Sequence, residues 1–253
     1  MNCPDFLNLC AKSFTRLEGI DAVKRLVPCN HDRPHGFTEK PYFMKIKTLA
    51  TGLLLAVLVS SASAADGYKK IFNGKNLKGW KVSTDNPSSV FVEDGQLVVF
   101  GPRAHAFYNG PVGKHDFKNF EFKAKVKTTE GSNSGIYFHT EYQDSGWPSK
   151  GYECQVNNTH KDPKKTGGLY AVQDNFEAPA KDGEWFDYYI KVDGNHVIIK
   201  INGKTISDYT QPENPEHLAK MPGRKISSGT MALQAHDPKS KVFFKDLMLK
   251  VND

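Results

Sequence analysis

The chain has 253 residues, with 34 Lys and Arg residues against 28 Asp and Glu residues, and a formal net charge of +6. After position 64, 24 of the 26 basic residues are lysines, and they are scattered along the chain. A nucleic-acid-binding protein more often clusters Arg and Lys beside stacking aromatic residues. The composition therefore predicts an ordinary solvated surface and no nucleic-acid partner.

Residues 44–64 have the three-part pattern of a secretory signal peptide. Lys45 and Lys47 form a basic start, residues 49–59 are an apolar run, and Ala62-Ser63-Ala64 is a small-residue cleavage site. The run is too short to span a bilayer comfortably. We expect cleavage after Ala64 and a periplasmic or secreted bacterial protein that leaves the membrane. Residues 1–43 are then an upstream segment outside the translated protein, or a disordered extension.

Residues 65–253 are long enough for one domain with a sizeable core. Cys154 is the only cysteine in this segment, so no disulfide can form within it. The core alone must stabilise the fold, even in an oxidising compartment.

Apolar and polar residues alternate along most of this segment, which is the period of a β-strand. We expect strands, in chain order, at 90–100 (a hairpin), 120–127, two runs within 134–158, 185–192, 196–203, 231–237 and 243–251. Asp94-Gly95, Asp193-Gly194 and Asn202-Gly203 mark hairpin turns because these residues tolerate positive φ. Only 212–222 suggests a helical turn. This pattern predicts an all-β protein, an antiparallel β-sandwich.

Three of these strands carry unusual polar residues on the face away from the core. The alternation places this face opposite Ile136, Cys154 and Leu233. The residues expected on it are Tyr137, His139, Glu141, Glu153, Gln155, Asn157, Gln234 and His236. An ordinary solvated strand of this chain, 120–127, uses Lys and Glu there instead. If the three strands are neighbours in one sheet, they form one polar floor suited to recognition and proton transfer.

Six segments occur in the order IFNGKNLKGW, NSGIYFH, GYECQV, TGGLY, GEWFDYYIKVDGNHVIIKING and MALQAHDPKSKVFFKDLMLK. Together they resemble the 3-keto-disaccharide hydrolase family, a secreted bacterial family, over residues 68–250. The resemblance implies a concanavalin-like jelly-roll sandwich and one catalytic domain over 65–253. Family members often have Arg where His139 stands, so the charge of the polar floor and the substrate can differ here.

The resemblance also implies an oligosaccharide or glycoside substrate that is already oxidised to a ketone at C3. The ketone acidifies the hydrogen on C2, because the carbanion spreads onto the ketone oxygen as an enolate, and the C1 group can then leave by elimination. Such a site needs a base near C2, a donor or metal near the C3 oxygen, and an acid near the glycosidic oxygen. It does not need the paired carboxylates of a conventional glycosidase.

Glu153 is the expected base of this reaction, because its neighbours in the strand are not lysines. His139 and His236 are expected as acid, base or metal ligands. For each of the three, the alternative is an ordinary surface residue held by a salt bridge or hydrogen bond. A divalent metal held by these three residues across strands stays open, although no HxH or HExxH spacing is present.

A second group of residues is expected to bind the sugar. Gln155 and Gln234 would bind hydroxyl groups, with a side-chain ladder on the sheet as the alternative. Tyr170 would stack on a sugar ring or donate to an oxyanion, and Trp147 would form a wall. Asn133 also belongs to this group, with a role as a turn former as its alternative.

Two other functions fit the same sandwich. A non-catalytic carbohydrate-binding module would use the amides and aromatic rings but would need no ionisable group. A conventional glycosidase would need a second carboxylate, which Glu141 could supply. The sequence indicates no particular oligomeric state.

Overall fold

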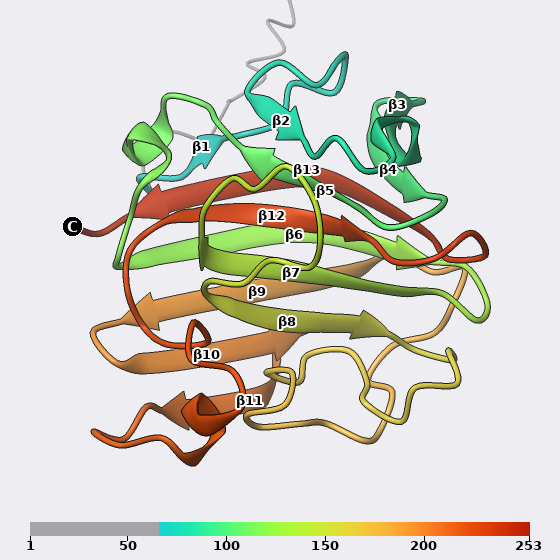
Figure 1. Cartoon of the computed structure of the whole chain (residues 1–253). Helices are drawn as coiled ribbons and strands as arrows, with labels where there is room; N and C mark the ends of the chain where they lie inside the picture. Colours follow the sequence, from blue (N-terminus) through green and yellow to red (C-terminus); the bar gives the residue numbers. More distant parts are fainter. Residues whose placement is uncertain (1–65) are drawn as a thin grey trace, which may run out of the picture. The chain divides into compact units, whose positions relative to one another are not determined.

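The computed structural model describes residues 66–253 (Figure 1). The expected signal peptide (44–64) and the segment 1–43 lie outside the described residues. No helix among residues 66–253 is long and apolar enough to cross a membrane.

The described residues form two antiparallel β-sheets, which confirms the predicted antiparallel sandwich. The eight-stranded sheet has the order β11 (Lys204–Thr210), β10 (His196–Ile201), β9 (Phe186–Asp193), β6 (Phe120–Thr128), β13 (Lys241–Val251), β4 (Gln96–Phe100) and β3 (Val90–Glu93), and β1 (Lys69–Lys70) pairs with β13. The five-stranded sheet has the order β2 (Trp80–Val82), β5 (Ala104–Tyr108), β12 (Thr230–Ala235), β7 (Asn133–Thr140) and β8 (Tyr152–Asn157). Figure 1 shows β12, β7 and β8 in front of the larger sheet.

The core lies between the two sheets and is built from the apolar side of the predicted alternation. Phe120, Phe122 and Val126 of β6 face it from the larger sheet, and Ile136 and Leu233 face it from the smaller one. All five are completely buried. Their alternate neighbours must therefore point away from the core, which places the polar residues of β7, β8 and β12 on the outer face of the smaller sheet.

Short 3₁₀ turns are the only helical elements among the described residues: η1 (Pro87–Ser89), η2 (Val112–His115) and η3 (Glu216–Ala219). The last lies within 212–222, where the sequence predicts a helical turn. Strands β1, β2, β5 and β11 were not predicted. In β5 all five residues are buried, so the strand has no exposed polar face that an alternating pattern could reveal.

Two connections enclose the outer face of the smaller sheet. The β7–β8 connection reaches toward β2, where the N–H of Thr84 donates to the Asp144 carbonyl (2.7 Å) and that of Gly146 to Asp85 Oδ2 (2.8 Å). The segment after β8 returns along that strand, where the Tyr170 N–H donates to the Glu153 carbonyl (2.9 Å). The outer face is thus walled on two sides and forms a cleft.

Candidate active site

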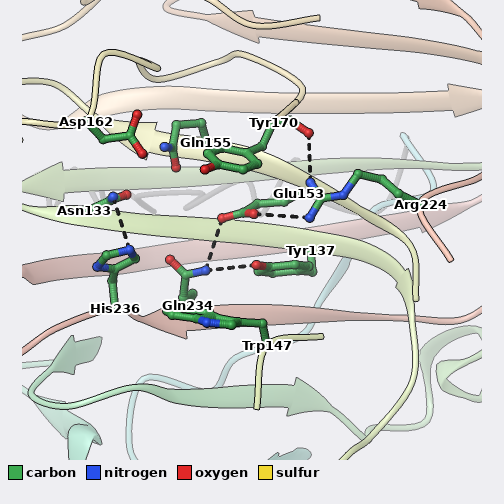
Figure 2. Close-up of a pocket in the computed structure, with 10 residues that line it drawn as sticks. All are labelled: Asn133, Tyr137, Trp147, Glu153, Gln155, Asp162, Tyr170, Arg224, Gln234 and His236. Atoms are coloured by element: carbon green, nitrogen blue, oxygen red, sulfur yellow. Dashed lines mark hydrogen bonds and ion pairs between the residues drawn. The ribbon is translucent and has the colours of Figure 1, made fainter. Parts of the chain in front are cut away.

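A cavity of about 370 Å³ lies on this outer face (Figure 2), within the usual size range of small-molecule sites. Its lining residues are Asn133, Tyr137, Trp147, Glu153, Gln155, Asp162, Tyr170, Arg224, Gln234 and His236. Seven of the eight residues predicted for the site therefore come together. Strand alternation predicts the site residues in and next to β8 and β12, whereas Tyr170 and Trp147 were predicted from their residue type and their place in loops.

Glu153 is the buried acid of the cavity, with 6% of its surface exposed. The strand register places it directly opposite Tyr137. Gln234 Nε2 donates both to Glu153 Oε1 (3.1 Å) and to the Tyr137 hydroxyl (3.0 Å). Burial raises the pKa of Glu153 above its ordinary value, and the nearby positive charge of Arg224 opposes this only in part. A carboxylate with a raised pKa in a cleft is typical of a general base.

Arg224 supplies the positive charge of the cavity. Its Nη2 lies 3.6 Å from Glu153 Oε2, and its Nη1 donates to the Tyr170 carbonyl (2.8 Å). The guanidinium side chain is 12% exposed, so little water screens it. Sequence reasoning missed Arg224, because it lies in the irregular segment before β12. The one available signal is that it is one of only two arginines in the lysine-rich segment 65–253.

Asn133 and His236 lie at the other end of the cavity from Arg224 (Figure 2). Asp237 Oδ2 lies 2.9 Å from His236 Nδ1, and Asn133 Nδ2 lies 3.4 Å from His236 Nε2. Burial works against ionisation of Asp237, but hydrogen bonds from Ser240 and His236 outweigh it and lower its pKa to about 2. An ionised Asp237 accepts the Nδ1 proton, so that Nε2 is left to exchange a proton in the cavity.

Two rings form the walls. The Trp147 ring, 46% exposed, lies 5.3 Å from the His236 ring. The ammonium of Lys164 lies 4.0 Å from the centre of the Tyr170 ring, and the Arg224 guanidinium carbon lies 5.5 Å from it. Because two cations already contact the Tyr170 ring, Tyr170 serves as a wall that holds Arg224 in place.

His139 was predicted to belong to the polar floor, and this prediction is wrong. His139 has a φ of +54°, and the pairing of β7 with β12 shifts register beside it, which ends the strand alternation. Its Nε2 hydrogen-bonds to the Lys118 carbonyl (2.8 Å) and its Nδ1 accepts from the Ser227 N–H (3.2 Å). Burial lowers its pKa to about 4, so it is neutral and both nitrogens are occupied.

A metal site made of His139, Glu153 and His236 was considered above. Glu153 and His236 line the cavity, but His139 does not, so these three residues do not come together. Among residues 66–253, no group of three or more His, Cys, Asp or Glu residues is arranged to hold a metal ion. Glu141 does not complete a carboxylate pair with Glu153 either. It is exposed, forms a salt bridge with Lys150 (3.2 Å), and lies outside the cavity. The second carboxylate of the cavity is Asp162.

His105 of β5 is a further residue that sequence reasoning missed. It is completely buried, neither ring nitrogen has a hydrogen-bond partner within residues 66–253, and burial lowers its pKa to about 3. Its ring packs edge-on against the Tyr137 and Trp147 rings at 5.6 Å and 5.7 Å. The strand register places this neutral imidazole beside Gln234, where it packs against the floor and the Trp147 wall.

Gly135 leaves the space that the Glu153 carboxylate occupies. A Cβ at position 135 would lie 2.6 Å from Glu153 Oε1. We expect Gly135→Ala to displace the carboxylate and lower kcat by about 100-fold, the cost of a misplacement of about 1 Å. The melting temperature should also fall, because the Cβ would lie 2.9 Å from Glu153 Cγ and overpacking at a buried site is destabilising. Wild-type kcat in a folded Gly135→Ala variant would contradict the assignment of Glu153 as the reacting group.

Comparisons with known proteins give the family and the fold of this chain. Residues 67–250 match the family described as the 3-keto-alpha-glucoside-1,2-lyase-like domain. The chain is 29% identical, over 171 residues, to a 3-keto-disaccharide hydrolase of Bacteroides thetaiotaomicron, and the match covers 57% of this chain and 59% of that protein. The chain thus spans less than two thirds of the length of this relative.

Two solved structures of candidate glycosyl hydrolases from Parabacteroides distasonis share the fold. The first has a TM-score of 0.63 at 24% identity, covering 74% of this chain and 94% of that chain. The second has a TM-score of 0.57 at 23% identity, covering 73% and 98%. The family match over residues 67–250 shows that this chain belongs to the 3-keto-alpha-glucoside-1,2-lyase-like domain family.

Proposed function

We propose that this protein cleaves 3-keto-glycosides, in particular 3-keto-disaccharides, by elimination followed by hydration. The observation that carries the proposal is the buried Glu153 carboxylate beside Arg224 in a cleft. A base and a fixed positive charge at this spacing suit the removal of a proton next to a ketone. The family match and the name of the Bacteroides relative point to the same substrate class.

Glu153 takes the proton from C2 of the oxidised ring, and the electron pair of that C–H bond moves to form the enolate. The negative charge then lies on the C3 oxygen. Arg224 and the Tyr137 hydroxyl, both beside Glu153, stabilise this charge by hydrogen bonds. Burial and the neighbouring Glu153 raise the pKa of Tyr137 well above its ordinary value, so the phenol keeps its proton and acts as a donor.

The enolate then reforms the ketone as the bond from C1 to the glycosidic oxygen breaks, which leaves a double bond between C1 and C2. The departing oxygen takes a proton from Nε2 of His236, which acts in this step as an imidazolium with its Nδ1–H donated to Asp237. Water next adds across the double bond: its hydroxyl bonds to C1 and its proton returns to His236. Glu153, whose carboxyl proton exchanges with solvent after the leaving group departs, gives a proton to C2, and both residues return to their starting states. The net result is hydrolysis to a free 3-keto sugar and an alcohol. Atoms and charge balance without an oxidant or reductant.

Sugar binding is supported by the amides of the cavity. Gln234 Oε1 and Asn133 Oδ1 are buried and have no hydrogen-bond partner among the described residues. A buried acceptor without a partner costs free energy, so native proteins rarely leave one unless a ligand or water satisfies it. Sugar hydroxyls supply donors of this kind, and two such acceptors would orient the oxidised ring over Glu153.

The test is turnover of a 3-keto-disaccharide beside the same disaccharide without oxidation. We expect release of sugar from the 3-keto substrate alone. Cleavage of the unoxidised disaccharide would instead indicate a conventional glycosidase that uses Glu153 with Asp162. Sugar binding without turnover of either substrate would indicate a carbohydrate-binding module.

The pH dependence should report the ionisation of Glu153. A base acts only when ionised, so kcat/KM should rise as pH rises through the pKa of Glu153 in the free enzyme. Because burial raises that pKa, the midpoint of this acid limb is expected above the ordinary value for glutamate. A pH series of kcat/KM measures it. A limb at or below the ordinary value would contradict the assignment of Glu153 as the base.

Secretion is also part of the proposal, and it is supported by the basic, apolar and small-residue pattern of residues 44–64. N-terminal sequencing of the exported protein tests it, with Ala65 as the expected first residue.

A further inference from the structure

A second cavity adjoins the active-site cavity at His236. It has a volume of about 550 Å³ and is lined by Gly131, His160, Lys161, His236, Asp237, Pro238 and Lys239. His236 lines both cavities. Arg224 lies at the other end of the first cavity from His236 (Figure 2), so the two cavities meet at the His236 end. The mechanism described above uses only the first cavity.

Three rings contact one another in succession from one cavity to the other. The Trp147 ring of the first cavity lies 5.3 Å from the His236 ring, and the His236 ring lies 5.7 Å from the His160 ring of the second. Sugar rings pack their C–H faces against flat rings, which provide a large and rigid contact area. A succession of such rings suits a substrate of more than one sugar unit.

Polar contacts of Asn133 and Asp237 with His236 and His160 lie where the two cavities meet. Asn133 Nδ2 lies 3.4 Å from His236 Nε2 and also 3.4 Å from His160 Nδ1. Asp237 Oδ2 lies 2.9 Å from His236 Nδ1 and 4.0 Å from His160 Nε2. His160 Nδ1 also accepts from the N–H of Asp162 (3.1 Å). The two imidazoles are therefore fixed relative to each other by a shared amide and a shared carboxylate.

We infer that the second cavity is the subsite for the leaving sugar. This inference rests on the proposed function, and it follows from where the proton donor lies. The base acts at C2 of the oxidised ring in the first cavity, and the scissile C1–O bond is one carbon away. The donor to the departing oxygen must lie beside that bond, and His236 lies at the boundary. The leaving unit, an unoxidised hexose ring, then rests on His160 beyond it.

Two substrates with different leaving groups test the assignment, a 3-keto-disaccharide and the methyl glycoside of the same 3-keto sugar. Wild-type protein should have a higher kcat/KM on the disaccharide. His160→Ala removes the ring of the second cavity and should lower kcat/KM on the disaccharide by about tenfold, or about 1.4 kcal/mol. It should lower kcat/KM on the methyl glycoside by a smaller factor, because only the disaccharide fills the second cavity.

Two further variants accompany His160→Ala. Lys239→Trp adds bulk from an exposed edge of the second cavity and should lower only the disaccharide rate, even if His160→Ala folds poorly. His196→Ala is the matched control, because His196 lies in β10 of the other sheet and contacts Asp208 there. It should change neither rate.

The outcomes separate this inference from the proposed function. Turnover of both substrates with equal kcat/KM in the wild type would overturn the inference and leave the proposed function standing. An equal loss on both substrates in His160→Ala and Lys239→Trp would also overturn the inference. Turnover of neither substrate by the wild type would overturn both.

Discussion

Glu153→Gln is expected to remove turnover of 3-keto-glycosides while sugar binding remains. The amide has the shape of the carboxylate but cannot accept the C2 proton. A general base contributes about 10²- to 10⁴-fold to rate, and kcat should fall by that amount. The buried position explains why water does not replace the lost group, since Glu153 is only 6% exposed. Steady-state kinetics and calorimetric binding of the product sugar measure the two effects.

Glu141→Gln is the matched control for this variant. Glu141 follows β7 and forms an exposed salt bridge with Lys150 outside the cavity. Its loss should leave kcat unchanged, because Glu141 does not line the cavity. The protein should also stay folded, because an exposed salt bridge contributes about 1 kcal/mol or less to stability. If Glu153→Gln kept its activity while Asp162→Asn lost it, the base would be Asp162 and the assignment of Glu153 would be wrong.

Arg224→Met is expected to lower kcat by about 10²- to 10³-fold, the usual effect of removing a donor to a developing oxyanion. It should also move the acid limb of the pH profile to higher pH. The Arg224 charge lowers the pKa of Glu153 against the larger effect of burial, so its removal raises that pKa further. A pH series of kcat/KM on wild type and variant measures both changes.

Lys225→Met is the control for Arg224→Met, because Lys225 is the adjacent residue and is exposed. Both proteins are assayed with and without a chelator. An unshifted acid limb in Arg224→Met would show that the Arg224 charge, 3.6 Å from Glu153, does not change the pKa of Glu153. Chelator-sensitive activity that survives loss of Arg224 would assign the charge at the C3 oxygen to a divalent metal.

The polar floor could be predicted from the sequence where strand alternation holds. Glu153 and Gln155 of β8, and Gln234 of β12, follow from their buried apolar neighbours, and all three line the cavity. The prediction for His139 is wrong because alternation predicts which face a side chain lies on only in regular strands. A positive φ and a register shift redirect its side chain, and neither is visible in residue type.

Residues from irregular segments could not be predicted in the same way. Arg224 and Asp162 reach the cavity from connections that have no period, so only the folded chain brings them beside Glu153. His105 was missed for a different reason. Both faces of β5 are covered, one by the core and one by the β7–β8 connection, and the strand therefore shows no polar face.

The source of the hydrogen on C2 of the product tests the central claim most directly. The protein is incubated with a 3-keto-disaccharide in deuterium oxide, and the released 3-keto sugar is analysed by nuclear magnetic resonance early in the reaction, beside free 3-keto sugar without protein. Elimination and hydration predict deuterium at C2 of the product at a rate that matches turnover. Retention of the original hydrogen at C2, with sugar released at the same rate, would contradict the account and indicate direct displacement at C1.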